Sequence, residues 1–229
     1  GGNLGMLVQG KEPDGGLDLE AVAARLDQRL RLLGRVLGMD LYGGLAIETL
    51  LDPAQEPFLR DHAIDGVPVL PGVMGLEGFA EVARALLPEH HIGGLEAVRF
   101  EQPMKYYRHQ PRSGIFRAVL RREGEDVVAE LTLTSTRALA TGEQAESRHF
   151  SGKVRLVRDA PAQVLCEPLA LNGHRPVSNE AIYRIFFHGP AYQVLDDVQL
   201  CAHSVRSTLR ADLPPALGRE GAATVLAPR

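Results

Sequence analysis

His62 opens the first group of residues whose types and spacing suit a chemical reaction. Gly66 and Pro71 follow it in the spacing HxxxGxxxxP, and Gly72 comes next. Imidazole is the side chain most readily available as a general base near neutral pH, and Gly66 lets a backbone pass close to a ligand. Pro71 suits the start of a helix, whose exposed N–H groups can hold a carbonyl oxygen that gains negative charge.

Glu77 lies in the helical pattern that follows this group. The pattern runs from about Gly72 to Leu87 and is nearly apolar on every side, so it suits burial inside a sheet. Gly75 and Gly78 are small enough for a sheet to wrap the helix closely. A buried glutamate needs a partner or a task. A role at a reactive site and a structural salt bridge therefore both stay open for Glu77.

A second group of interest is the segment HGPAYQ at residues 188–193. Gly189 and Pro190 force a tight bend, and Tyr192 beyond the bend can fill the wall of a pocket. Ser178 is expected to cap a short helix over residues 179–187, immediately before this segment.

These two groups resemble known patterns. PGVMGLEGFAEVA, which begins at Pro71, resembles the active-site segment of hot-dog-fold β-hydroxyacyl thioester dehydratases. HxxxGxxxxP resembles the dehydratase domains of polyketide synthases and of similar megasynthases, such as polyunsaturated fatty acid synthases. HGPAYQ is similar to the YGPxFQ motif of these dehydratase domains, with His188 in place of Tyr and Tyr192 in place of Phe.

The resemblance implies a role for each residue. It makes His62 and Glu77 catalytic: the histidine removes the α-proton of a β-hydroxyacyl thioester, and a carboxyl group protonates the departing hydroxide. The product is the α,β-enoyl thioester of polyketide or fatty acid chain assembly. The residues that the resemblance assigns to substrate binding are Gly66, Pro71, Gly72, His188, Gly189, Pro190 and Tyr192.

The resemblance also implies cofactors and partners. The substrate is carried on the phosphopantetheine of an acyl carrier protein, so neither a metal nor a dissociable cofactor is expected. Neighbouring synthase domains and a second copy in a homodimer are the other expected partners. A product-template cyclase, a double-bond isomerase or a thioesterase on the same fold stays open, as does a non-catalytic hot-dog module that only binds acyl chains.

The order of the expected elements predicts an α+β hot-dog fold, in which a curved antiparallel sheet wraps one long helix. A helix with Asp18 as its N-cap is expected first, over residues 19–37. Residues 138–147 are expected to form the loop of a hairpin. The expected extended segments are 45–51, 58–61, 95–100, 115–121, 127–134, 150–157, 194–201 and 205–211.

The chain is expected to form an incomplete double hot-dog. Residues 1–40 would be a linker and an N-terminal helix, 41–160 the first hot-dog half with His62, and 161–229 the truncated start of the second half. In the dehydratase family the central helix of the second half carries an acid that pairs with the histidine of the first half. Residues 212–229 hold no such helical pattern. We therefore expect the chain to be an excerpt of a longer protein, with this acid beyond Arg229.

Composition argues against several other classes of protein and site. A net charge of −4 over 229 residues argues against a general nucleic-acid surface. No apolar run approaches the length of a membrane span. Cys166 and Cys201 have neither a metal-site nor a redox spacing, so two reduced thiols in a cytoplasmic protein are expected. The other histidines form no spaced cluster and are expected to be surface or structural residues.

Overall fold

The computed structural model describes residues 19–29, 32–40, 44–138, 141–162, 175–200, 204–210, 212 and 224–226. The expected N-cap Asp18 and both cysteines lie outside these residues. In the part of the chain so described, no helix is long and apolar enough to cross a membrane.

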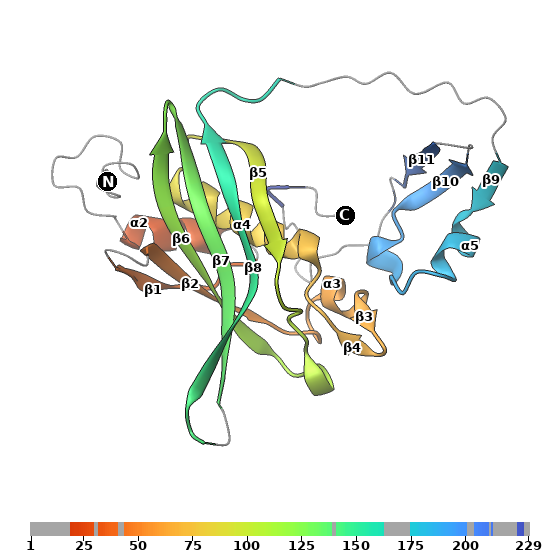
Figure 1. Cartoon of the computed structure of the whole chain (residues 1–229), viewed down its shortest axis with the longest axis horizontal. Helices are drawn as coiled ribbons and strands as arrows, with labels where there is room; N and C mark the ends of the chain where they lie inside the picture. Colours follow the sequence, from red (N-terminus) through yellow and green to blue (C-terminus); the bar gives the residue numbers. More distant parts are fainter. Residues whose placement is uncertain are drawn as a thin grey trace.

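One antiparallel sheet curves around the long helix α4 (Gly72–Leu86), as the sequence predicted (Figure 1). All of its strand pairs are antiparallel. The strands of this 6-stranded sheet, in spatial order, are β1 (Arg35–Asp40), β2 (Gly44–Leu51), β6 (Arg112–Glu123), β7 (Asp126–Ala138), β8 (Gln144–Val157) and β5 (His91–Phe100).

Two glycines allow α4 to lie close to the sheet. A Cβ added to Gly75 would lie 2.3 Å from the ring of Phe150, and one added to Gly78 would lie 2.3 Å from the ring of Phe116. Phe79 of the same helix is fully buried and meets Phe116 edge to face, with 6.0 Å between the ring centroids. The predicted close wrapping of the helix at Gly75 and Gly78 is therefore confirmed.

The N-terminal helix is shorter than predicted. Helix α2 (Leu19–Arg29) ends well before residue 37, and residues 35–40 form the edge strand β1. Gly34 explains part of the change, because a Cβ there would lie 2.7 Å from the carbonyl oxygen of Glu48 on β2. The backbone N–H of Leu32 donates to Oε2 of Glu81 on α4 at 2.9 Å. These contacts direct the chain into the sheet, where pairing with β2 outweighs its helical periodicity.

Three further predictions change at their boundaries. Residues 58–61, expected to be extended, belong largely to helix α3 (Pro57–Arg60), because Pro57 suits a first helical turn. Strands β7 and β8 continue into residues 138–147, so the loop between them is shorter than expected. Ser178 does cap helix α5 through a hydrogen bond from the Ala181 N–H at 3.2 Å, but α5 spans only Asn179–Tyr183.

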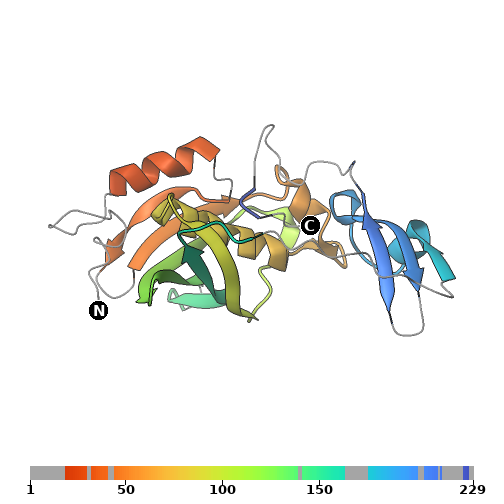
Figure 2. The same ribbon diagram turned by 90° about the horizontal axis from the view of Figure 1, so that it is seen from above.

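A second unit, defined here as residues 175–210, follows the main sheet. Its 3-stranded sheet has the order β11 (Val205–Leu209), β10 (Leu195–Leu200), β9 (Arg175–Ser178), and the predicted hairpin is formed by β10 and β11. Figures 1 and 2 show this unit beside α3 and the small hairpin of β3 (Ala63–Ile64) and β4 (Val67–Pro68). The second unit therefore lies at the end of the main sheet where α4 begins.

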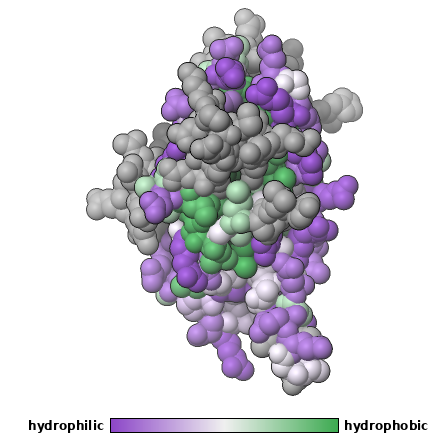
Figure 3. Space-filling model, turned by 90° about the vertical axis from the view of Figure 1, so that its left-hand side faces the viewer, coloured by the Kyte–Doolittle hydropathy of each residue, from purple (hydrophilic) through white to green (hydrophobic). Residues whose placement is uncertain are grey.

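At the other end, most of the atoms that are coloured in Figure 3 are hydrophilic. Figure 3 views the end of the molecule that carries α2 and β1, and an apolar patch lies near the centre of that view. Three of the residues predicted from the sequence, His62, His188 and Tyr192, lie at the opposite end, around a cavity between the start of α4 and the second unit.

The close approach at Gly78 gives a stability prediction. Gly78→Ala should lower the free energy of unfolding by about 1–3 kcal/mol, although alanine is the better helix former by up to about 1 kcal/mol, because its Cβ must displace the buried ring of Phe116. Urea unfolding measures the change. Gly94→Ala is the matched control, since a Cβ there meets nothing within 4 Å. Equal midpoints for the two variants would contradict this packing.

Candidate active site

His62 lies between α3 and the β3–β4 hairpin, which fold it back toward the start of α4. Its backbone carbonyl accepts the Val69 N–H at 3.0 Å across the hairpin. Asp65 and Gly66 form the turn of the hairpin with positive φ angles of 51° and 75°. The glycine thus meets the conformational need of the turn, and it does not line the cavity beside His62.

A backbone hydrogen bond sets the tautomer of His62. Its Nδ1 lies 2.9 Å from the carbonyl oxygen of Val69. A carbonyl only accepts, so Nδ1 carries the proton and Nε2 keeps its lone pair. Burial lowers the pKa of His62 from its ordinary 6.5, the Val69 hydrogen bond opposes this, and the nearby charge of His188 lowers it further. His62 is therefore a neutral imidazole near pH 7, with a basic nitrogen available.

Three rings of the second unit surround this imidazole. The ring of Phe187 meets His62 edge to face at 5.0 Å, His188 lies at 5.6 Å and Tyr192 at 5.9 Å, measured between centroids. Phe187 and His188 also stack on each other at 4.5 Å. These contacts bring together the two sequence groups that were predicted to share a site.

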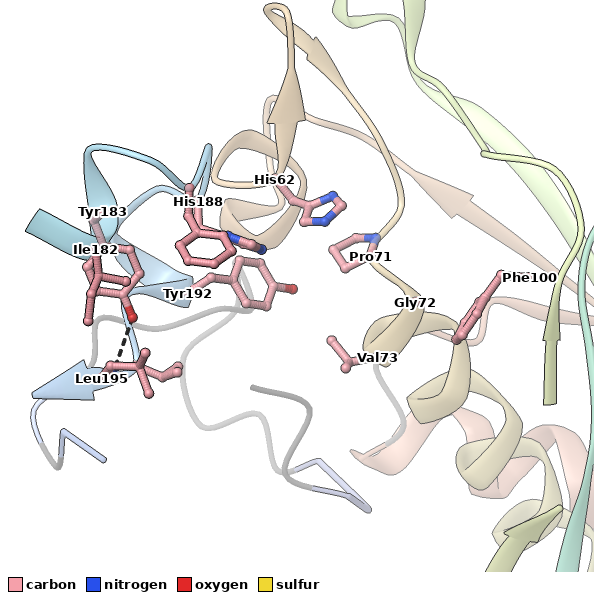
Figure 4. A pocket seen from close by; sticks show the side chains of 12 residues that line it. His62, Pro71, Gly72, Val73, Phe100, Ile182, Tyr183, His188, Tyr192 and Leu195 are labelled. Carbon is pink, nitrogen blue, oxygen red and sulfur yellow. Dashed lines mark hydrogen bonds between the residues drawn. The ribbon is translucent and has the colours of Figure 1, made fainter. Parts of the chain in front are cut away.

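A cavity of about 420 Å³ opens beside His62, between the start of α4 and the second unit (Figure 4). Most of its wall is apolar or aromatic. Its lining residues are His62, Pro71, Gly72, Val73, Phe100, Ile182, Tyr183, Phe186, His188, Tyr192, Val194 and Leu195. In Figure 4, the hydroxyl of Tyr192 points between His62 and Val73.

The start of α4 adds hydrogen-bond donors to the cavity. Pro71 is the extended N-cap residue, and its carbonyl accepts the N–H groups of Met74 and Gly75, each at 3.1 Å. The N–H groups of Gly72 and Val73 have no acceptor within the helix, because they belong to its first turn. These two residues line the cavity, and the positive end of the helix dipole favours negative charge there.

Glu77 lies farther along α4 and does not line the cavity. It is fully buried, and its two carboxylate oxygens accept the N–H groups of Val225 at 2.5 Å and Leu226 at 2.7 Å. Burial raises the pKa of Glu77, while these two hydrogen bonds oppose the rise. The structure brings together His62, Pro71, Gly72, His188 and Tyr192 around the cavity, and leaves Glu77 apart from them.

Gly189 and Pro190 shape the wall rather than line it. Pro190 starts the short turn η2 (Pro190–Tyr192), which places Tyr192 against His62. Gly189 lies against Asp61, the residue before His62. The sequence reasoning did not single out Asp61 or Phe100. The direct adjacency of Asp61 to the predicted base is the one sequence signal that points to it.

His149 is buried too, but it belongs to the sheet. Its Nδ1 lies 2.9 Å from the carbonyl oxygen of Gln102, and its Nε2 lies 2.7 Å from Oγ of Ser135. Arg112 donates to the same Oγ at 2.6 Å. This network ties the end of β5 to β7 and β8. Among the residues that the structure covers, no cluster of His, Cys, Asp and Glu could hold a metal ion.

Comparisons with known proteins found similarity to polyketide synthases and to a polyunsaturated fatty acid synthase. Residues 31–125 match the model of the polyketide synthase dehydratase domain. Polyketide synthase ThaG of Burkholderia thailandensis is 28% identical over 173 residues, which are 70% of this chain and 3% of that protein. A polyunsaturated fatty acid synthase protein of Thraustochytrium sp. is 27% identical over 162 residues, which are 64% of this chain and 5% of that protein.

Solved structures agree as well. The dehydratase domain of PpsC from Mycobacterium tuberculosis superposes with a TM-score of 0.60 at 20% identity, covering 86% of this chain and 68% of that one. A likeness of this kind shows a shared fold, the hot-dog arrangement of a sheet around α4 with a second unit beside it. With the motifs around His62 and in the second unit, these matches support a polyketide synthase dehydratase domain.

Proposed function

We propose that this chain removes water from a β-hydroxyacyl thioester carried on an acyl carrier protein, giving the α,β-enoyl thioester. The observation that carries this proposal is the fixed tautomer of His62. Its Nδ1–H is bonded to Val69, so the lone pair of Nε2 is the basic group beside the cavity. A neutral imidazole in a largely apolar wall is suited to removing a weakly acidic proton.

The reaction can be followed bond by bond. Nε2 of His62 takes the α-proton, and the electrons of the broken C–H bond move into the thioester carbonyl to give an enolate. These electrons then form the Cα=Cβ double bond as the Cβ–O bond breaks, and the hydroxide leaves as water after gaining a proton. Negative charge that develops on the thioester oxygen is stabilised by the N–H groups of Gly72 and Val73 at the start of α4.

The wall of the cavity favours an acyl chain as ligand. Val73, Ile182, Leu195 and Phe100 present hydrocarbon surface to it, and burying apolar surface stabilises binding by roughly 25 cal/mol per Å². Two relatives support this proposal. The PpsC dehydratase domain has been solved in complex with C12:1-CoA. A CurJ dehydratase mutant that has phenylalanine in place of a histidine is described as inactive.

The group that donates a proton to the departing hydroxide is the subject of a separate proposal. Glu77, or an acid beyond Arg229, was predicted as this donor, and that role stays a prediction. Both oxygens of Glu77 hold backbone N–H groups, so we propose instead that Glu77 anchors the segment at Val225 and Leu226. The proton donor is then another acid or the imidazolium of His62.

The expected partners follow from the substrate. The acyl carrier protein delivers the thioester on its phosphopantetheine, and no other cofactor enters the proposed reaction. Both curated relatives are synthases of which this chain matches a small part, so the proposed partners include neighbouring synthase domains. A homodimer remains part of the proposal.

Replacing the base tests the proposed function directly. His62→Ala should lower the rate of water loss from a short β-hydroxyacyl thioester at least about 10²-fold, since general base catalysis contributes that much or more. Mass spectrometry of the thioester measures the loss of water. His91→Ala is the matched control, because His91 is exposed at the start of β5. Activity retained in the folded His62→Ala protein would overturn the assignment.

The lowered pKa of His62 gives a pH dependence. Protonation of Nε2 removes the lone pair, so kcat/KM should fall toward acid, and the inflection should lie below the ordinary pKa of 6.5. Burial is the main cause, and the titratable neighbours in ring contact are His188 and Tyr192. His188→Phe keeps a ring and removes its charge, so the inflection should rise toward 6.5. An inflection unmoved by this change would show that the His188 charge has no effect on His62.

Glu77→Gln separates an anchor from a proton donor. Glutamine turns an amide NH₂ toward the N–H groups of Val225 or Leu226, so the free energy of unfolding should fall by about 1.5–3 kcal/mol, while kcat/KM changes less than 10-fold. Thermal unfolding and single-turnover assays measure the two effects, beside Glu89→Gln on the exposed surface. A fully stable variant that loses activity 10²-fold or more would instead make Glu77 the proton donor.

A further inference from the structure

Asp61, the residue before His62, holds the second unit through two hydrogen bonds. Its Oδ2 accepts the Ala191 N–H at 2.7 Å, and its backbone carbonyl accepts the Gly189 N–H at 2.7 Å. Both donors lie in the segment that carries His188 and Tyr192. A hydrogen bond to a carboxylate is roughly twice as strong as one between neutral groups, so this residue fixes the segment firmly.

The contact is close enough to require glycine at position 189. A Cβ there would lie 2.7 Å from Oδ1, 2.8 Å from Cγ and 2.9 Å from Cα of Asp61. The backbone of Gly189 has φ −77° and ψ −178°, which any residue can adopt. The glycine therefore serves the close approach to Asp61 and meets no special need of its own backbone.

The contact of Asp61 with Gly189 and Ala191 determines which side chains lie beside the imidazole of His62. Chain geometry places His188 immediately before Gly189, and η2 places Tyr192 immediately after Ala191. Their rings lie 5.6 Å and 5.9 Å from the ring of His62. Helix α3, which ends next to Asp61, packs against η2. The place of the two rings over His62 therefore depends on the contact between α3 and η2.

We infer that Asp61 is a positioning residue, which docks the His188–Tyr192 segment over the imidazole of His62 and completes the wall of the cavity. Asp61 does not line the cavity itself, so it acts through the rings it holds in place. The inference rests on the proposed function for its effect on catalysis, but its effect on His62 can be measured without turnover.

The expected effect on His62 has a definite sign. Burial is the largest cause of its lowered pKa, and the His188 charge adds to it. If the His188–Tyr192 segment no longer docks on Asp61, water reaches the imidazole of His62 and the charge of His188 lies farther from it. Both changes raise the pKa of His62 toward 6.5. A residue that only stabilised the fold would leave this pKa in place once the protein was folded.

Three variants test the inference, each titrated by NMR at the His62 imidazole and assayed for kcat/KM. Asp61→Ala should raise the pKa of His62 toward 6.5 and lower kcat/KM by roughly 10- to 100-fold, the range that displaced catalytic geometry can cost. Gly189→Ala should reproduce both effects by wedging the segment away from an intact Asp61. Asp61→Asn keeps an oxygen acceptor for the Ala191 N–H and should retain most of both properties.

Asp159→Ala is the matched control, because Asp159 is exposed beyond the end of β8. A His62 pKa that stays unchanged in folded Asp61→Ala or folded Gly189→Ala protein overturns the inference, and if the first variant does not fold, the second decides. A wild-type chain without dehydratase activity would overturn the proposed function alone, since the pKa of His62 would still report on the docked segment.

Discussion

The close fit between α4 and the sheet is the constraint on which the rest of the structure depends. A helix surrounded by strands must present small residues where aromatic rings cross it, and Gly75 and Gly78 do so under Phe150 and Phe116. Because the sheet encloses the helix along its length, the N-terminal end of α4 is where it meets the cavity. The helix dipole, the first-turn N–H groups and the bend at Pro71 therefore act at one place, beside His62.

Two acidic residues of α4 show how carboxylates are accommodated where the sheet surrounds the helix. Glu77 and Glu81 are both fully buried. Each accepts backbone N–H groups from a distant segment: Glu81 from Leu32, and Glu77 from Val225 and Leu226. A buried carboxylate that accepts such donors satisfies its own need for partners and that of the backbone. The two acids thus connect flanking segments of the chain to the core helix.

Much of the fold and part of the site could be predicted from the sequence. Long periodic segments such as α4, β6 and β7 carry their structure in local patterns, and the two motifs identified His62, His188 and Tyr192. The failures have physical causes. Residues 35–37 were predicted to be helical, but they belong to β1, which pairs with β2, and a preference for sheet pairing is not visible locally. The catalytic role of Glu77 stays a prediction, and no local signal in the sequence indicates that Val225 and Leu226 reach its carboxylate.

The hydrogen bonds of Glu77 and Glu81 also bear on the order in which the chain folds. Glu81 meets a residue 49 positions away, whereas Glu77 meets residues 148 and 149 positions away. Closing a longer loop costs more chain entropy, and contacts of wide sequence separation slow folding. The hairpins of the main sheet are local by comparison, so they can pair first. We therefore expect the hydrogen bonds from Val225 and Leu226 to Glu77 to form late, after the core has assembled.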